Sequence, residues 1–338
     1  MSRDSSSRRK PGSRVGQAPS LSPREAPVLD RATAGSGFRD PRVLAPFLLI
    51  TLIWSSTWIV IKDQLGEVPP VWSVSYRFLI ASAVMLLIAR LGGSGPRLGR
   101  GGHGLAALLG LLQFVVNYNC VYIAELYITS GLAAVVFALL VVPNALLARL
   151  CFGAPITARF ALGSGVAMAG VALLFVQEIR MATAAPQAVL VGLACTLIAV
   201  LAASIANVMQ LAQGMKTRSV AVMLGSAMLY GGLLDAAFAW AVAGPPVVED
   251  RAGYWLGLAY LSVIASSLAF WLYYRIIRAI GPAKAAYSSV LIPIVAMILS
   301  TLFEGYRWSP LAIGGGVLGV AGLIIALRAG RAPAAAAE

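Results

Sequence analysis

Residues 43–62 read VLAPFLLITLIWSSTWIVIK, and apolar runs of this kind decide the fold class. One charged side chain, Lys62, stands at the end of the run, and no other charge interrupts it. A helix rises 1.5 Å per residue, so about 20 apolar residues cross the roughly 30 Å hydrocarbon core of a bilayer. This stretch therefore predicts a transmembrane helix.

Nine similar runs follow, joined by short connectors that carry glycine and proline, such as Gly92-Gly93-Ser94-Gly95-Pro96. The chain of 338 residues is 59% hydrophobic and only 12% charged, whereas soluble domains carry about 25% charged residues. We therefore expect an all-α integral membrane protein surrounded by the lipid bilayer. Its ten transmembrane helices should lie near residues 43–62, 70–90, 105–124, 130–149, 160–177, 187–210, 219–243, 254–275, 284–303 and 311–328.

The distribution of positive charge predicts how these helices are oriented. The net charge is +13, and the N-terminal 42 residues hold nine of the 26 Lys and Arg. If the N-terminus lies inside, 21 of the 26 fall in the tails and inner loops, and four fall in outer loops. Positive residues are retained on the cytoplasmic side of a membrane. We therefore expect a multi-pass protein of the plasma (inner) membrane with both termini cytoplasmic and with no nucleic-acid partner.

The two ends of the chain differ in composition from the apolar middle. Residues 1–42 are rich in Ser, Arg, Gly and Pro, with too little apolar content to offset the entropy of ordering. They predict a disordered basic cytoplasmic tail, with contact to anionic lipid or a regulatory role as the alternative to a solvated tail. The basic run is separated from the first apolar run by more than 30 residues, which excludes a secretory signal. Residues 329–338 predict a short second cytoplasmic tail.

Prolines and glycines recur at nearly constant offsets along the chain, which indicates an internal duplication. Pro143 and Pro293 are 150 residues apart. Two glycine pairs are each separated by 152 residues, Gly163 with Gly315 and Gly170 with Gly322. Glycine and proline also occur in unrelated transmembrane helices, but the shared order of small residues, proline, turn and paired glycine favours a true repeat.

A duplicated unit of five helices places its second copy upside down in the membrane, because five is an odd number. Inverted repeats of this kind recur in secondary transporters. We expect a first five-helix repeat over 43–177 and a second over 178–328. Pro143 and Pro293 lie in the middle of predicted helices and are hinge candidates.

Four motifs, taken in order, resemble the EamA domain of the drug/metabolite transporter superfamily. They are Leu52-Ile53-Trp54-Ser55-Ser56-Thr57, Tyr76-Arg77-Phe78, Gly131-Leu132-Ala133-Ala134 with Pro143, and Phe303-Glu304-Gly305. The resemblance covers roughly residues 46–328 and implies ten helices in an inverted five-plus-five fold. It also implies export or uptake of small metabolites such as amino acids. Ala154 departs from the family, which usually has Glu there, and the second copy lacks the Trp-Ser and Arg-Phe elements.

Two ionisable residues, Arg77 and Asp235, lie clearly within predicted spans. A charge at the centre of a transmembrane helix costs about 2.5–3.5 kcal/mol on insertion scales, so each needs a partner or a cavity. The two residues lie at similar depth in the second and seventh spans, and we hypothesise that they form an ion pair, directly or through water, when the outer side is closed. The alternative is that carbonyl groups satisfy Arg77, and that backbone or Ser groups beside Gly231 and Gly232 satisfy Asp235.

Uncharged polar and aromatic side chains recur on several spans and are candidates for a substrate cavity. Gln113 and Asn117 are four residues apart and should share one face of a helix. Such side chains also hold transmembrane helices together without forming a site. Together they predict an aromatic interior without a carboxylate near the middle, suited to neutral, zwitterionic or amphipathic molecules. The candidates are Trp54, Ser55, Ser56, Gln113, Asn117, Tyr118, Asn144, Ser204, Asn207, Ser267, Trp271, Tyr287 and Ser288.

These observations predict a secondary transporter that moves a small-molecule substrate by alternating access, with export favoured. A non-transporting receptor or scaffold is the alternative. A membrane-embedded enzyme is disfavoured, because the single histidine, His103, lies in an inner loop and no paired intramembrane carboxylates occur. Cys120, Cys151 and Cys195 lack the spacing of metal ligands, so neither a metal nor a cofactor is expected. Coupling to protons or to another ion, the substrate and the oligomeric state remain open.

Overall fold

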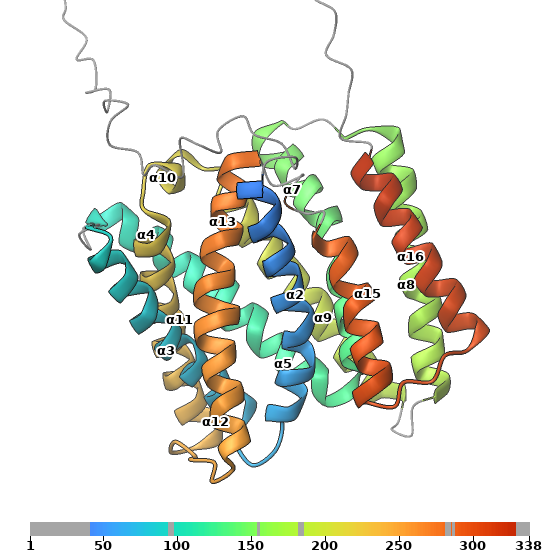
Figure 1. Cartoon of the computed structure of the whole chain (residues 1–338), viewed down its shortest axis with the longest axis horizontal. Helices are drawn as coiled ribbons and strands as arrows, with labels where there is room; N and C mark the ends of the chain where they lie inside the picture. The colour runs from blue at the N-terminus through green and yellow to red at the C-terminus, as the bar shows by residue number, and fades with distance from the viewer. Residues whose placement is uncertain are drawn as a thin grey trace, which may run out of the picture.

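The computed structural model describes residues 41–93, 98–153, 156–181, 186–280, 285 and 288–328. Within these ranges the chain forms helices and short loops and contains no strand. The helices pack side by side in one bundle, and both described ends of the chain lie at its upper end (Figure 1). The predicted tails over 1–42 and 329–338 lie almost entirely outside the described residues.

Seven of the longer segments are unbroken α-helices, and three are composite helices in which the hydrogen-bonding pattern changes. The unbroken helices are α2 (Pro41–Gln64), α3 (Pro70–Leu91), α8 (Ala158–Met181), α9 (Pro186–Met209), α11 (Val220–Ala243), α15 (Ser288–Phe303) and α16 (Pro310–Arg328). The composite helices are α4–η1–α5 (Gly99–Leu109, Gly110–Val116, Asn117–Tyr127), α6–η2–α7 (Ser130–Phe137, Ala138–Leu140, Val141–Phe152) and α12–η3–α13 (Ala252–Ala259, Tyr260–Leu268, Ala269–Ile280). A short helix, α10 (Gln213–Lys216), precedes α11.

The bundle has the dimensions of a membrane domain. Seven helices of the described residues are long and apolar enough to cross a bilayer, which confirms the prediction of an all-α membrane protein. Three further apolar helices are shorter, over Ala158–Leu174, Ile292–Phe303 and Pro310–Ala326, and they coincide with the fifth, ninth and tenth predicted spans. The count of ten transmembrane helices is not confirmed by length and composition alone and stays a prediction.

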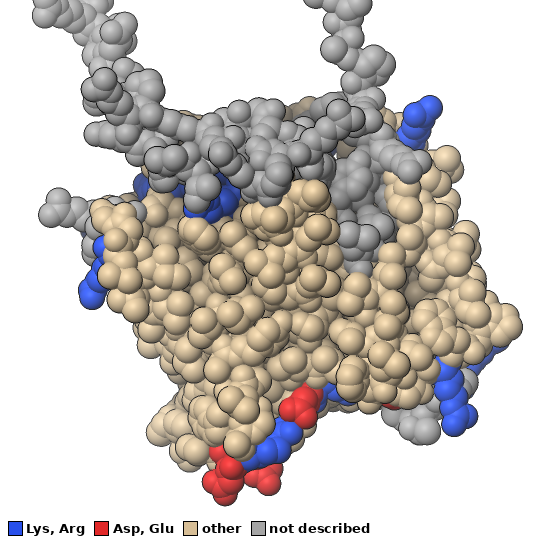
Figure 2. All heavy atoms as spheres, viewed as in Figure 1, with Lys and Arg blue, Asp and Glu red and all other residues tan. Residues whose placement is uncertain are grey.

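The outer surface of the bundle also suits a bilayer. A broad middle zone of the face in Figure 2 is free of charged side chains, and the acidic side chains visible there gather at the lower end. Large apolar side chains point outward along the helices, including Leu87 and Leu150, which are 56% and 80% exposed. Water would disfavour such a surface, whereas lipid tails solvate it.

Two π-helical stretches occur at matching positions of the two halves. The stretch η1 runs over Gly110–Val116, and η3 runs over Tyr260–Leu268. Their first residues are 150 apart and their last residues 152 apart, the same offsets as those of the prolines and glycines. Because π-helices are rare, this recurrence is the pattern that two related five-helix units would produce.

The most extensive helix contacts join α8 to α16 and α3 to α11, as Figure 1 shows for the first pair. Each pair consists of counterpart helices from the two halves. A Cβ atom on Gly163 would overlap the backbone of Ala326, and one on Gly170 would overlap the backbone of Gly319. The glycine spacing in the sequence therefore reflects the close approach of two backbones, which only a residue without a side chain allows.

The two hinge candidates lie where helical geometry is disturbed. Pro143 follows η2, a turn of 3₁₀-helix over Ala138–Leu140. Proline has no N–H group to bond the carbonyl four residues earlier, here that of Leu139, and this accounts for the local change of pattern. Pro293 lies inside α15. A hinge function for either proline stays a prediction.

The close packing of α8 on α16 leads to a first prediction. Gly163→Ala should lower the stability of the protein by about 1–3 kcal/mol, because the added methyl group meets backbone atoms that cannot move aside. Gly165→Ala, two residues away on the same helix, has open space around the added methyl group and should be neutral or slightly stabilising. Thermal unfolding in detergent measures both variants. Equal stability of the two would show that α8 and α16 are not packed this closely.

Candidate functional site

A cavity of about 110 Å³ lies between helices from both halves of the chain. Its walls come from α2, η1, α5, α6, η2, α7, α9, α13 and α15. The side chains that line it are largely aromatic, amide or aliphatic, and none carries a charge. They are Trp54, Thr57, Trp58, Ile61, Gln113, Asn117, Tyr118, Val121, Ala134, Phe137, Ala138, Leu140, Val141, Asn144, Ala203, Asn207, Phe270, Tyr273, Ser288, Ile292 and Pro293.

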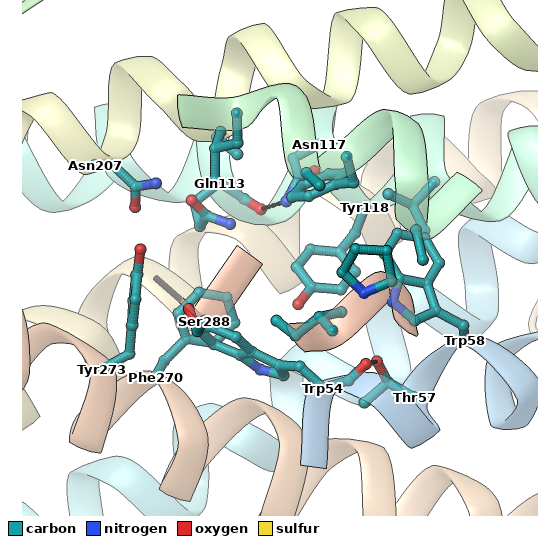
Figure 3. A pocket seen from close by; sticks show the side chains of 18 of the residues that line it. Trp54, Thr57, Trp58, Gln113, Asn117, Tyr118, Asn207, Phe270, Tyr273 and Ser288 are labelled. Atoms are coloured by element: carbon teal, nitrogen blue, oxygen red, sulfur yellow. Dashed lines mark hydrogen bonds between the residues drawn. The ribbon is translucent and has the colours of Figure 1, made fainter. Parts of the chain in front are cut away.

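The amide side chains lie across the cavity from two of its aromatic rings. In the view of Figure 3, Gln113 and Asn117 line the upper wall with Asn207 beside them, while Trp54 and Phe270 lie opposite. The rings of Trp54 and Phe270 are 5.4 Å apart, centroid to centroid. The indole N–H of Trp54 donates to the carbonyl of Ala265 at 3.2 Å, which fixes the orientation of the ring. The cavity thus offers a rigid aromatic surface facing a polar one.

Two amide oxygens in the polar wall have no hydrogen-bond partner. Gln113 and Asn117 are 4% and 2% exposed, and the side-chain oxygen of each is unpaired. The Asn117 Nδ2 group donates to the backbone carbonyl of Gln113 at 3.2 Å, so its oxygen is turned away from that contact. A buried acceptor without a partner costs about 1–3 kcal/mol. A bound molecule with N–H or O–H groups would recover this energy.

Seven of the predicted site residues line the cavity: Trp54, Gln113, Asn117, Tyr118, Asn144, Asn207 and Ser288. Their role in binding a substrate stays a prediction. Sequence reasoning missed several aromatic lining residues, including Trp58, Phe137, Phe270 and Tyr273. Phe270 and Tyr273 are three residues apart, so their spacing on one face of a helix was an available signal.

Other predicted residues lie outside the cavity, where they bond to neighbouring helices. Ser55 donates to the carbonyl of Thr51 at 2.7 Å within its own helix. The hydroxyl of Ser56 lies 2.6 Å from that of Tyr260. These hydroxyls bond within the helix bundle and do not line this cavity, and a role for either serine in substrate binding stays a prediction.

The remaining corrections follow the same pattern. Ser204 donates to Asn144 Oδ1 at 2.8 Å and therefore lies behind a lining residue. Ser267 lies in η3 and donates to the carbonyl of Ala81 at 3.2 Å. The indole ring of Trp271 lies under the guanidinium group of Arg275, 4.6 Å from ring centroid to Cζ, and does not reach the cavity. Tyr287 lies outside the described residues.

The profile of the EamA-like transporter family matches this chain twice, over residues 43–176 and 190–328. The chain belongs to the EamA-like transporter family. The two matches cover most of the sequence, and this confirms the prediction of a membrane transporter rather than an enzyme. The cavity therefore lies between the two family units, because Asn117 and Asn144 belong to the first match and Asn207 and Phe270 to the second.

Relatives of this EamA-like chain support the same assignment. Protein PagO of Salmonella typhimurium is 23% identical over 276 residues, which cover 79% of this chain and 90% of PagO. The uncharacterized inner membrane transporter YedA of Escherichia coli is 28% identical over 263 residues, or 75% of this chain and 80% of YedA. A crystal structure of a protein with 18% sequence identity shares the fold, with a TM-score of 0.64 over 85% of this chain and 97% of the other.

The two predicted intramembrane charges of this EamA-like transporter do not pair with each other. The Nε group of Arg77 donates to Ser266 Oγ at 2.9 Å, and its guanidinium carbon lies 4.5 Å from the centroid of the Tyr118 ring. Asp235 accepts a hydrogen bond of 2.6 Å from Asn119 Nδ2. Among the described residues, the one ion pair joins Arg251 to Asp63. The structure therefore contains no direct Arg77–Asp235 ion pair, and pairing through water stays a prediction.

Different neighbours explain this outcome. The side chain of Arg77 is 1% exposed and is held between η3 and the aromatic ring of Tyr118. Cation–π contacts contribute up to about 2 kcal/mol when water is excluded. Because Tyr118 lines the cavity, Arg77 supports the aromatic wall from behind. Equal depth in two helices did not imply that the two charges face each other.

A third buried ionisable residue was missed from the sequence. Glu125 is fully buried, although it lies just beyond the predicted end of the third span. The ammonium group of Lys62 bonds to the backbone carbonyl of Glu125 and, at 3.4 Å, to that of Ile128. Val121, one helical turn before Glu125, lines the cavity, so the Glu125 carboxyl group lies one turn beyond the lining.

The contacts of Asp235 lead to a second prediction. Asn119→Ala and Asp235→Ala should each destabilise the protein, and their double variant should lose less than the sum by about 0.5–3 kcal/mol. Arg77→Gln combined with Asp235→Ala should be additive, because the two residues share no hydrogen-bond partner. Reversible unfolding in mixed micelles measures both cycles. A coupling energy between Arg77 and Asp235 would contradict this structure and would support an ion pair between them.

Proposed function

We propose that this EamA-like transporter is a secondary transporter that moves small amphipathic metabolites, such as amino acids, across the plasma membrane. In this proposal ten transmembrane helices form two inverted five-helix repeats, over 43–177 and 178–328, with both termini in the cytoplasm. The repeats rock about the cavity, which opens to one side of the membrane at a time. The observation that carries the proposal is the cavity itself, since it is enclosed by both family units and has unpaired acceptors.

The chemistry of the cavity supports a class of substrate. The unpaired oxygens of Gln113 and Asn117 favour a molecule with N–H or O–H donors. The facing rings of Trp54 and Phe270 favour an apolar or aromatic body. No lining side chain supplies a full charge to balance an inorganic ion. An amphipathic metabolite with a donor-bearing head group satisfies all three conditions.

Contacts between the two repeats support a state that is closed to the outside. Arg251 of the second repeat bonds Asp63 of the first at 2.9 Å. The Tyr76 hydroxyl donates to the carbonyl of Val247 at 3.0 Å, and the indole N–H of Trp72 reaches the loop that follows α11. Under the proposed topology these contacts lie on the outer side. Transport then requires that they separate.

The proposed topology is tested by labelling single cysteines in a chain whose three natural cysteines are replaced by serine. Gly66→Cys and Gly101→Cys are a matched pair, since both positions are exposed and have open space around an added side chain. In intact cells an impermeant maleimide should label the cysteine at 66, and the cysteine at 101 should react only after permeabilisation. Labelling of both positions from the same side would contradict the ten-span topology.

The proposed transport activity is tested with a growth screen against amino acids and their toxic analogues. An exporter should protect cells that express it, whereas an importer should sensitise them. Compounds that give a difference are then measured as radiolabelled fluxes in proteoliposomes. A receptor or scaffold would give no protein-dependent flux for any compound of the panel.

The role of the cavity is tested with the same compounds. Asn117→Ala should reduce flux at least tenfold, which corresponds to about 1.4 kcal/mol, because it removes an acceptor that faces the substrate. Ser262→Ala is the matched control, since this buried hydroxyl donates to the carbonyl of Leu258 and does not line the cavity. Thermal unfolding should be nearly unchanged for Asn117→Ala. Normal flux in that variant would mean that the substrate binds elsewhere.

A further inference from the structure

A cluster of polar residues closes the outer end of the cavity. It consists of Lys62, Glu125, Ser130 and Glu304, and we call it the outer cluster. On three helices the residue one turn beyond a lining residue belongs to this cluster: Lys62 follows Trp58, Glu125 follows Val121, and Ser130 precedes Ala134. The outer cluster is therefore the next layer of the path that leads from the cavity to the outer face.

The hydroxyl of Ser130 lies between two carboxyl groups. Its Oγ atom is 2.8 Å from Glu125 Oε2 and 2.9 Å from Glu304 Oε1. Its third oxygen neighbour, the backbone carbonyl of Trp58, is more distant at 3.4 Å. Both contacts to carboxyl oxygens have the length of O–H···O hydrogen bonds.

A hydroxyl group has one hydrogen and can donate it to only one of the two carboxyl oxygens. The other short contact needs a hydrogen from the carboxyl group itself, which must then be protonated. Two carboxylates separated only by the Ser130 hydroxyl group in a buried site would also repel each other. The geometry of Glu125, Ser130 and Glu304 therefore requires one additional proton.

The surroundings place that proton on Glu125. This side chain is 0% exposed, and its Oε1 atom has no hydrogen-bond partner. The Lys62 ammonium group bonds backbone carbonyls and forms no ion pair with the Glu125 carboxyl group within the described residues. Glu304, in contrast, accepts bonds from the Ser130 N–H at 3.3 Å and from Ser300 Oγ at 2.5 Å. A buried carboxylate with at most one hydrogen-bond donor is far less stable than a neutral acid.

Few other ionisable groups face the cluster. The ionisable group that α2 contributes is Lys62, which is part of the cluster. On α3 the buried ionisable group is Arg77, whose guanidinium group is held by Ser266 and Tyr118. On α5 the Tyr122 hydroxyl donates to Gln64 Oε1 at 2.9 Å. The helix α9 contributes Cys195, at the level of Cys120, while α6 and the described side chains of α15 contain no titratable group.

We propose that the outer cluster is a proton-binding site, in which Glu125 and Glu304 share one proton through Ser130 and thereby hold the two repeats together at their outer ends. Glu125 and Ser130 belong to the first family unit and Glu304 to the second. Release of the proton leaves two carboxylates facing one hydroxyl, and their repulsion favours separation of the repeats. Glu304 is partly exposed and connects the site to water outside.

This inference rests on the proposed function for its consequence, which is coupling of transport to protons. Closure of the outer side would take up one proton from outside, and this proton would be released to the inside before the outer side opens again. The proton carried in on closure would exchange for a substrate carried out, so that a pH gradient, acidic outside, drives export. The site itself can be examined without any substrate.

The first test detects the proton by infrared spectroscopy of the full-length protein in lipid, near neutral pH. The difference between the infrared spectra of wild type and Glu125→Gln should contain the carbonyl stretching band of a protonated carboxylic acid. The frequency of this band should shift in heavy water. Glutamine retains a donor toward Ser130, so this variant should fold, as thermal unfolding will verify. Asp235→Asn is the matched control: it removes another fully buried carboxyl group and should leave the Glu125 band unchanged. A difference spectrum that contains only carboxylate bands would overturn the proposal.

The second test measures coupling with compounds found in the growth screen. In wild-type proteoliposomes an imposed pH gradient should drive accumulation of the compound against its concentration gradient. Glu125→Gln should lose this accumulation and keep exchange of the compound at equal concentrations. Accumulation that is unchanged in Glu125→Gln, or absent in wild type despite flux, would overturn the coupling. Absence of any flux in wild type would instead refute the proposed function, and the infrared result would still decide whether the proton site exists.

Discussion

The hydrocarbon core of a bilayer contains no water that could satisfy a polar group, and this constraint governs the whole structure. It requires helices, whose backbone groups bond within each segment, and it requires each buried polar side chain to find a partner in the protein. Asp235 is satisfied in part by Asn119, and Arg77 in part by Ser266 and the ring of Tyr118, while Asp235 Oδ2 and Arg77 Nη1 have no hydrogen-bond partner. Most serines of the spans bond a carbonyl one turn earlier or on a neighbouring helix.

Several buried polar atoms of the described residues have no hydrogen-bond partner, and some of these atoms lie in or next to the cavity. Gln113 and Asn117 have unpaired oxygens in the cavity, and Glu125 has one at its outer end. In a medium without water, an unpaired buried group is retained only where it serves a purpose or is paired part of the time. The three residues lie along η1 and α5, with Val121 on the turn between Asn117 and Glu125, and this face runs from the proposed substrate site to the proposed proton site.

The close contact between counterpart helices explains how such a cavity is supported. The α8–α16 pair is packed backbone to backbone through glycines. The cavity lies instead between α2, α5, α7, α9, α13 and α15, where aromatic and amide side chains keep the backbones apart. The fold therefore combines tightly packed peripheral pairs with a more open centre, the arrangement that movement of one repeat against the other requires.

The sequence by itself determined the class of fold and the duplication, because hydropathy, charge distribution and residue spacing are properties of segments. It also identified seven lining residues, from Trp54 to Ser288. Only the tertiary structure decided which faces meet. The π-helical stretch η3 departs from α-helical spacing, and Ser267 within it donates to the carbonyl of Ala81 and does not line the cavity. Glu125 and Glu304 are 179 residues apart, and their shared contact with Ser130 arises because helices of the two repeats come together in space.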